Sequence, residues 1–345
     1  MKPQDYYQYL VEISGVASYR RPPTADQFPE GLFAEAGFNK AEIDLVRSAG
    51  LEMNEDHSVR GAGWVNLVLR EVLSPLADEQ QQQMRDIVFA GEFPTGDYNA
   101  QIVRVPDEKR YVILVNVGLL ALLHDVAKVI VFSEWPRAGN GSPELPNGTI
   151  SAGEALDNEG RGYFRDLIRN YAEFGDCVRP RKRFAPCGKP NLVSDLLAWG
   201  AYRFVLAHEI AHVVLGHLDH AEAATITVRG SGVKIPVLNK PMKEELYADT
   251  LGGQILMAAL FKKWKSRSLE APMWYAGPFF FLGLADILEK ALSLESSTHP
   301  PARVRCMALE RFMEKTLPRE LFDTCRSASR RIVQQLQSVG ESCSR

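Results

Sequence analysis

The sequence lacks the features that mark several common protein classes. Its 345 residues include five cysteines, an odd number with no CxxC pair, which suits a reducing compartment. The formal net charge is only −3, so the composition gives no electrostatic reason to expect nucleic acid or an anionic membrane as a partner. A convincing apolar run of about 20 residues, the length that spans a membrane, is also missing. The first residues, Met1 to Tyr6, lack the apolar core of a signal peptide. We therefore expect a cytoplasmic protein without stable membrane insertion.

The main chemical signal is the pentapeptide from His208 to His212, which has the pattern HExxH. The surrounding residues, from Asn191 to Leu215, are rich in apolar side chains and predict a buried helix, and Gly216 is typical of a helix C-terminus. On a helix, His208 and His212 lie one turn apart on one face, as two nitrogen ligands of a single zinc ion must. Glu209 lies about 100° round the helix from His208, where a general base that is not a ligand is needed.

A third ligand has to come from another segment. The third histidine of the metzincin pattern is missing, because Leu218 occupies its position. The run from Glu244 to Gly252 predicts a second helix, on which Glu245 and Asp249 share a face. One of these carboxylates can complete the metal site while the other orients a histidine ligand from behind.

Together these segments resemble the gluzincin metallopeptidases, in particular the CAAX-prenyl-protease and heat-shock-protease family. In that family HExxH is followed by an E-x-x-A-D segment and then by a His-Pro element with an arginine downstream. This chain has the first at His208 to His217, the second at Glu245 to Asp249, and the third at His299-Pro300 with Arg305. The usual members are membrane proteins, and the short segment between the two helices is closer to soluble phage-exclusion and repressor-cleaving peptidases.

The resemblance implies a zinc-dependent endopeptidase with one zinc ion per chain and a protein or peptide substrate. His208, His212 and Glu245 would hold the zinc, and Glu209 would activate the zinc-bound water. Asp249 and Arg305 would support the ligands from the second layer. His299 would hydrogen-bond the developing oxyanion, with Tyr275 or Tyr247 as alternatives and a helix-capping role as the plainer explanation of His299. His217 and His220 lie off the ligand face and are expected to be structural or exposed. The oligomeric state is unknown.

Two other functions are kept as alternatives. The adjacent pair His124-Asp125 is similar to the core of HD-type metal-dependent phosphohydrolases, and His57 is a candidate for the further histidine that such a site needs. The plainer interpretation is an amphipathic helix over Leu119 to Phe132. The second alternative is a regulatory protein whose zinc site is only structural.

The expected fold is α+β: a mostly helical, zincin-like metallopeptidase domain with a small sheet over the HExxH helix. We expect a helical N-terminal region over 1–95, the peptidase domain over 96–315, and a C-terminal helix over 316–345 that packs on it. The sequence patterns predict the following elements: helices over 41–49, 61–75, 78–90, 161–174, 301–315 and 319–338; a turn-rich link over 91–96; hairpins over 99–117 and 225–238; an exposed loop over 135–160; and a core helix over 271–285. The second hairpin is expected only to connect the two ligand helices, with a position beside the cleft as the alternative.

Overall fold

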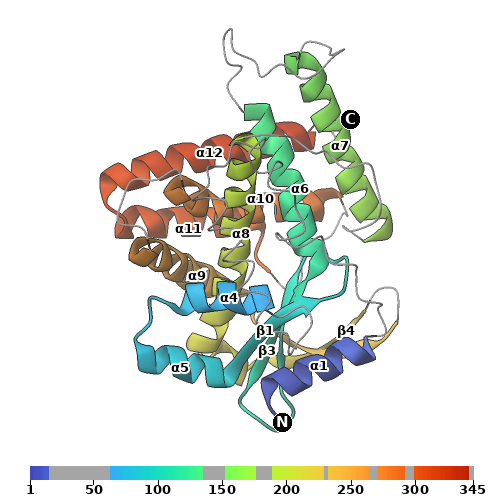
Figure 1. Cartoon of the computed structure of the whole chain (residues 1–345), viewed down its shortest axis with the longest axis vertical. Helices are drawn as coiled ribbons and strands as arrows, with labels where there is room; N and C mark the ends of the chain where they lie inside the picture. The colour runs from blue at the N-terminus through green and yellow to red at the C-terminus, as the bar shows by residue number, and fades with distance from the viewer. Residues whose placement is uncertain are drawn as a thin grey trace, which may run out of the picture.

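The computed structural model describes residues 1–14, 63–134, 152–175, 189–228, 232–263, 270–291 and 299–341 (Figure 1). The helices are α1 (Pro3–Ile13), α4 (Gly63–Leu73), α5 (Asp78–Ile87), α6 (Val117–Glu134), α7 (Ala152–Phe174), α8 (Lys189–Val214), the 3-10 helix η2 (His217–Asp219), α9 (Met242–Lys263), α10 (Glu270–Ala291), α11 (Ala302–Thr316) and α12 (Arg319–Glu341). The strands are β1 (Val88–Phe93), β2 (Ala100–Arg104), β3 (Tyr111–Asn116), β4 (Glu222–Thr227) and β5 (Lys234–Asn239). This mostly helical structure with two small sheets confirms the predicted α+β class.

Helix α8 lies at the centre of the molecule, in contact with α4, α6, α9, α10 and strand β2 (Figure 1). Its side chains are apolar on nearly all faces, and most of those from Leu197 to Ile210 are buried. A helix that is hydrophobic all round is stable only inside a protein, since each of its faces needs a neighbour. The motif residues therefore stand on the most enclosed helix of the fold.

Two small sheets lie at one end of the molecule, together with α1, α4 and α5 (Figure 1). The first has the strand order β1-β3-β2, in which β2 and β3 form the predicted antiparallel hairpin. The second is the predicted antiparallel pair β4-β5, in the chain between α8 and α9. Strand β2 contacts both α8 and β5, so it lies between the motif helix and the second sheet.

The prediction for residues 78–96 was partly wrong. Helix α5 ends at Ile87, and the next six residues form β1, which pairs in parallel with β3. Three apolar residues of this strand, Val88, Ala90 and Phe93, are buried. A parallel partner distant in the sequence leaves no local signal, and the glycines around this strand indicated a turn. The expected domain boundary at residue 95 falls between two strands of this sheet, and the domain division itself stays a prediction.

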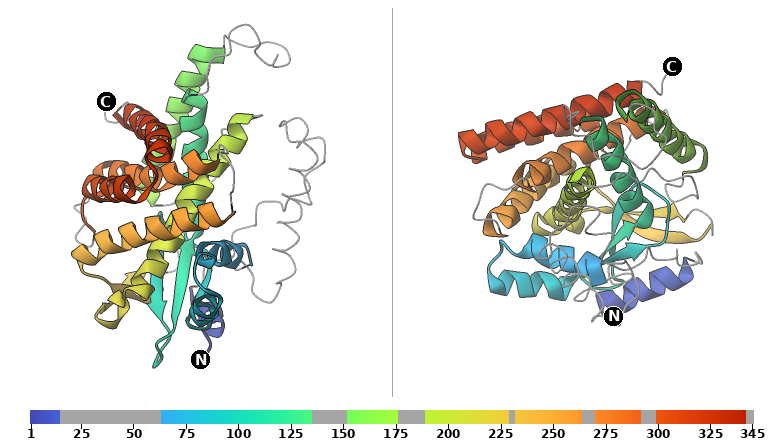
Figure 2. Two further views of the ribbon diagram at one scale, coloured as in Figure 1. Left: turned by 90° about the vertical axis from the view of Figure 1, so that its left-hand side faces the viewer. Right: turned by 45° about the horizontal axis from the view of Figure 1, so that its top comes forward.

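The remaining helices were predicted well in position. Helices α4, α9, α11 and α12 cover the expected segments, with α12 packed across α10 (Figure 2). Helix α7 begins at Ala152, so the expected loop over 135–160 is too long at its C-terminal end. The rest of that loop and the predicted helix over 41–49 lie outside the described residues.

Helix α10 is, within the described part of the chain, the one helix long and apolar enough to cross a membrane. The same composition is typical of a core helix, and the buried share of its most apolar window is 61%. Its neighbours are α8, α11 and α12, and its buried side chains include Tyr275 and Phe280. In this fold α10 is a core helix, as its sequence predicted.

Candidate metal centre

The two histidines of the HExxH motif face the same point. His208 and His212 lie on the last turns of α8, and their Nε2 atoms are 3.1 Å apart. Both side chains are buried. The helical repeat predicted this juxtaposition, because residues i and i+4 lie one above the other on a helix.

Helix α9 brings Glu245 to this pair. The Glu245 carboxylate oxygens lie 3.3 Å from His208 Nε2 and 3.4 Å from His212 Nε2. Glu245, Asp249 and Gly252 form one stripe along α9, with the spacing i, i+4 and i+7 that faces a neighbouring helix. A Cβ atom on Gly252 would meet the backbone nitrogen of His208 at 2.9 Å, so the absence of a side chain there sets how closely α9 approaches α8.

These three residues fit a metal ion. Their ligand atoms all lie within 4.8 Å of one another, and among the described residues they are the one group of three or more potential ligands with this property. Two ligands of a tetrahedral zinc ion, each about 2.0–2.1 Å from the metal, are roughly 3.3 Å apart, close to the separations found here. Glu245 Oε2 is buried and accepts no hydrogen bond of good geometry from a described residue, as expected of an atom directed at a cation.

The electrostatics of the ligands are strongly coupled. Burial disfavours the charged form of His208, but the carboxylates of Asp249 and Glu245 raise its pKa to about 9. Burial and the positive charge of Lys240 lower the pKa of His212 to about 3. For Glu245, burial acts to raise the pKa, but the adjacent imidazoles of His208 and His212 hold it well below its usual range. In the metal-free site at neutral pH, His208 is therefore the cationic imidazole and His212 is neutral.

Asp249 and Arg305 contact each other and the ligands from behind the site. Asp249 Oδ1 lies 3.0 Å from His208 Nδ1, the ring nitrogen that points away from the other ligands. Arg305 donates two hydrogen bonds of 2.7 Å to the Asp249 carboxylate, and its Nη2 lies 3.7 Å from Glu245 Oε2. Burial raises the pKa of the Asp249 carboxyl, but the guanidinium more than offsets this and holds it at about 2. Such outer contacts fix the ring orientation and tautomer of a histidine ligand.

Glu209 lies beside the ligands with an unexpected partner. Its carboxylate accepts a hydrogen bond of 3.1 Å from Nζ of Lys240, and both side chains are largely buried. Burial acts to raise the pKa of Glu209, but the charge of Lys240 gives a net lowering. Lys240 directly follows β5, so the second hairpin does border the site. Lys240 belongs to no motif, so no sequence pattern predicted its place at the site.

His217 also contacts the site, through His212. Gly216 adopts a left-handed conformation with φ of 69°, which ends the helical segment and starts the short helix η2. This turn brings His217 Nδ1 to within 3.0 Å of His212 Nδ1. The structural role predicted for His217 therefore corresponds to a specific contact with His212. His220 is exposed, as expected.

His299 lies near the ligands. Its Nε2 is 3.4 Å from Glu245 Oε2, and its side chain is 36% exposed. Helix α11 has Pro301 as its N-cap, without a side-chain cap, so His299 is not the capping residue that the sequence allowed. Burial is the main cause that lowers the pKa of His299 to about 4, which makes the ring neutral at pH 7.

The two tyrosines considered as alternatives to His299 do not line the site. Tyr275 is fully buried, with its ring against those of Phe279 and Phe322. Tyr247 is 64% exposed, and it lies about 200° round α9 from Glu245. For Tyr247 the physical reason is its position round the helix axis, which closeness in sequence to Glu245 does not take into account.

The His124-Asp125 pair does not form a second metal group among the described residues. His124 Nδ1 lies 3.2 Å from Asp195 Oδ1, and its ring meets Trp199 edge-on, both contacts with α8. Asp125 pairs with Lys128 on its own helix. His57 lies outside the described residues. The arrangement fits the plainer interpretation, a helix whose polar face packs on α8.

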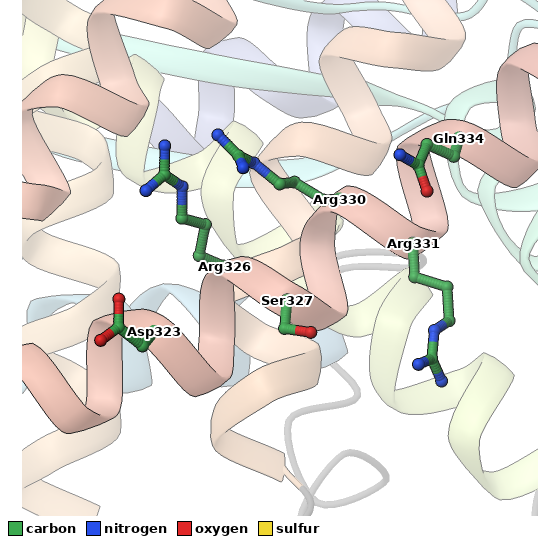
Figure 3. Close-up of a pocket in the computed structure, with 6 residues that line it drawn as sticks. All are labelled: Asp323, Arg326, Ser327, Arg330, Arg331 and Gln334. Carbon is green, nitrogen blue, oxygen red and sulfur yellow. The ribbon is translucent and has the colours of Figure 1, made fainter.

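A separate hollow lies on the surface of α12 and contains none of the residues above. It is lined by Asp323, Arg326, Ser327, Arg330, Arg331 and Gln334, all from one helix (Figure 3). Figure 3 shows the side chains of Arg326 and Arg330 on the same side of α12, and both guanidinium groups contact Glu310 of α11. We assign it no function.

Comparison with known proteins agrees with this site. A family model described as Peptidase U49 matches residues 149–317, a little under half of the chain. The matched segment includes both ligand helices, His299 and Arg305. No curated protein and no solved structure matches the chain. The match supports a peptidase family for this chain, and His208, His212 and Glu245, which could hold a metal ion, lie within the matched segment.

Proposed function

We propose that the protein is a zinc-dependent metalloendopeptidase of the gluzincin type, with His208, His212 and Glu245 as the zinc ligands and one zinc ion per chain. The supporting observation is the convergence of three ligand atoms within 4.8 Å beside a buried Glu209. A structural zinc site normally closes its coordination shell with four protein ligands, whereas a catalytic site leaves a position open. A three-ligand set next to a carboxylate that is not a ligand favours catalysis.

In this proposal zinc supplies Lewis acidity, which polarises a peptide carbonyl and makes water more acidic. Glu209 takes a proton from the attacking water and delivers it to the nitrogen of the scissile bond. The water oxygen bonds to the carbonyl carbon, the C–N bond breaks, and the products are a carboxylate and an amine. His299, neutral at pH 7, donates a hydrogen bond to the carbonyl oxygen as negative charge develops there.

The supporting residues act before the chemistry begins. Asp249 holds His208 in the tautomer whose Nε2 lone pair is free for the metal, and Arg305 keeps Asp249 ionised. We further propose a protein or peptide substrate, which rests on the peptidase resemblance. We also propose a cytoplasmic location, which rests on the composition. The composition likewise suggests neither nucleic acid nor a membrane as partner.

The test compares the wild-type protein with Glu209→Gln on a proteome-derived peptide library, with metal content measured by elemental mass spectrometry. We expect one zinc ion per chain in both proteins and cleavage only by the wild type. Undiminished cleavage by Glu209→Gln would refute the assignment of the base. Zinc in both proteins without cleavage by either would favour a regulatory protein with a structural site.

A further inference from the structure

Lys240 enters the metal centre from the segment that joins the second hairpin to α9. Its Nζ donates to Glu209 Oε2 at 3.1 Å, across 31 positions of sequence. The Lys240 side chain is 9% exposed and that of Glu209 is 6% exposed, so both charges are nearly withdrawn from water. Glu209 is the one titratable residue of the HExxH motif that is not proposed as a ligand. Its partner, Lys240, belongs to no motif.

A buried ion pair of this kind is a poor way to stabilise a fold. The cost of removing two charges from water is comparable to their attraction, and a well-packed apolar pair of similar volume often does as well or better. Lysine also loses considerable side-chain freedom when it is held in one conformation. Stability alone therefore does not account for a lysine at this position.

The position of Lys240 indicates a role at the site. The ammonium group is close enough to His212 and His299 for its charge to lower the pKa of both rings. The other cation of the site, Arg305, is engaged with Asp249 on the far side of His208. Lys240 thus holds the base from one side, while Arg305 acts on the ligands from the other.

We propose that Lys240 is a positioning residue for Glu209: its ammonium fixes one carboxylate oxygen, so that the other faces the reacting water and the scissile peptide. The inference deepens the proposed function and rests on it. A flexible glutamate samples several rotamers, and a displacement of about 1 Å at a catalytic group costs up to about 100-fold in rate. A lysine anchored at the end of a strand removes that freedom without contacting the substrate.

The experiment uses acetohydroxamate, a small metal ligand whose bound form gives up a proton to a well-placed carboxylate. Its affinity for the zinc-loaded full chain therefore reports the orientation of Glu209 without the need for a known substrate. The proteins compared are the wild type, Lys240→Met, Lys240→Gln and Lys240→Arg. Lys234→Met, at the exposed first residue of β5, is the matched control. Zinc stoichiometry and the urea unfolding midpoint are measured for each protein.

We expect Lys240→Met and Lys240→Gln to retain zinc but to bind the hydroxamate on the order of tenfold more weakly. Lys240→Arg should recover most of the affinity, since it keeps a cationic donor, and Lys234→Met should match the wild type. Adding Lys240→Met to Glu209→Gln should cause little further loss, because the lysine acts through that carboxylate.

The inference is overturned if zinc-loaded Lys240→Met or Lys240→Gln binds the hydroxamate as the wild type does. It is also overturned if these variants lose zinc, which would mean that Lys240 acts on the ligands, or if their loss adds in full to that of Glu209→Gln. A purely structural role would lower the unfolding midpoint of both variants without a change in hydroxamate affinity. Failure of the proposed function would give different results. Either the wild-type protein would bind no zinc, or the Glu209→Gln variant would still cleave peptides.

Discussion

Asp249 and Arg305 form a bidentate ion pair inside the protein, with Nε to Oδ2 and Nη2 to Oδ1 both at 2.7 Å. They are 56 positions apart in the sequence and come from different helices, α9 and α11. The pair links the helix that carries Glu245 to the segment that begins at His299. Through the second contact of Asp249, with His208, it also reaches α8.

The first prediction concerns the loss of the arginine from this pair. Arg305→Met leaves the Asp249 carboxylate buried without its main partner, and removing one member of a buried pair typically costs about 3–5 kcal/mol. We expect the free energy of unfolding of the metal-free protein to fall by about that amount in urea titrations. Arg330→Met is the control, because Arg330 is 56% exposed and its surface pair with Glu310 is worth about 0–1 kcal/mol. Equal effects of the two substitutions would contradict the structural role of Arg305.

The second prediction concerns pH and zinc. In the metal-free protein the pKa of His208 is raised to about 9, because the carboxylates of Asp249 and Glu245 outweigh the effect of burial. Below that pH zinc must displace a proton from His208, so its apparent affinity should rise by up to about tenfold per unit as the pH increases from about 6 to about 8. Calorimetry in buffers of different ionisation enthalpy should count about one proton released per zinc ion.

A variant separates this effect from other protonations. Asp249→Asn removes the largest cause that raises the pKa of His208, so it should release less proton on binding zinc at neutral pH. Zinc affinity that is flat over this pH range in the wild type would show that His208 is already neutral.

The third prediction concerns His217. Its Nδ1 contacts Nδ1 of His212, which leaves Nε2 of His212 for the metal. Removal of an outer contact of this kind typically lowers metal affinity about 10- to 100-fold, so we expect that loss for His217→Ala in competition with a chelator. His220→Ala changes an exposed histidine three residues further on and should leave the affinity unchanged. A similar loss in both variants would point to a general disturbance of η2.

The parts of the site set by local geometry could be predicted from the sequence. The one-turn spacing of His208 and His212 and the shared face of Glu245 and Asp249 follow from the helical repeat, once both segments are predicted as helices. Gly216 marked the end of the motif helix because glycine readily takes the left-handed conformation found there. The predicted role of Arg305 came from the family resemblance, since no local sequence pattern links Arg305 to Asp249.

The parts set by non-local packing could not be predicted. Strand β1 was predicted as the end of a helix and a link, because its partner β3 is distant and parallel. Lys240 lies beside Glu209 because the chain leaves the second hairpin next to the motif helix, a path that the residues of the hairpin do not specify. To predict the contact of His217 with His212, one would need to know the direction in which the chain leaves Gly216. In each case the missing information is the relative position of two elements, and a pattern within one element does not contain it.

The last prediction concerns the distance between the two ligand helices. A Cβ atom on Gly252 would lie 2.9 Å from the backbone nitrogen of His208 and 3.0 Å from its Cα, and backbone atoms cannot yield as a flexible side chain does. In Gly252→Ala, α9 has to move away from α8, which shifts Glu245 and Asp249 relative to the histidines. We expect a loss of about 1–3 kcal/mol in the free energy of unfolding, as for overpacked cores, together with weaker zinc binding.

Gly162→Ala is the matched control for Gly252→Ala. Gly162 also lies within a helix, α7, but a Cβ atom there meets nothing within 4 Å. Alanine has the higher helix propensity, so this variant should be more stable than the wild type by up to about 1 kcal/mol, with unchanged zinc affinity. If Gly252→Ala were also stabilising and kept its zinc affinity, the two ligand helices would have room to spare, and their close approach would not set the geometry of the metal centre.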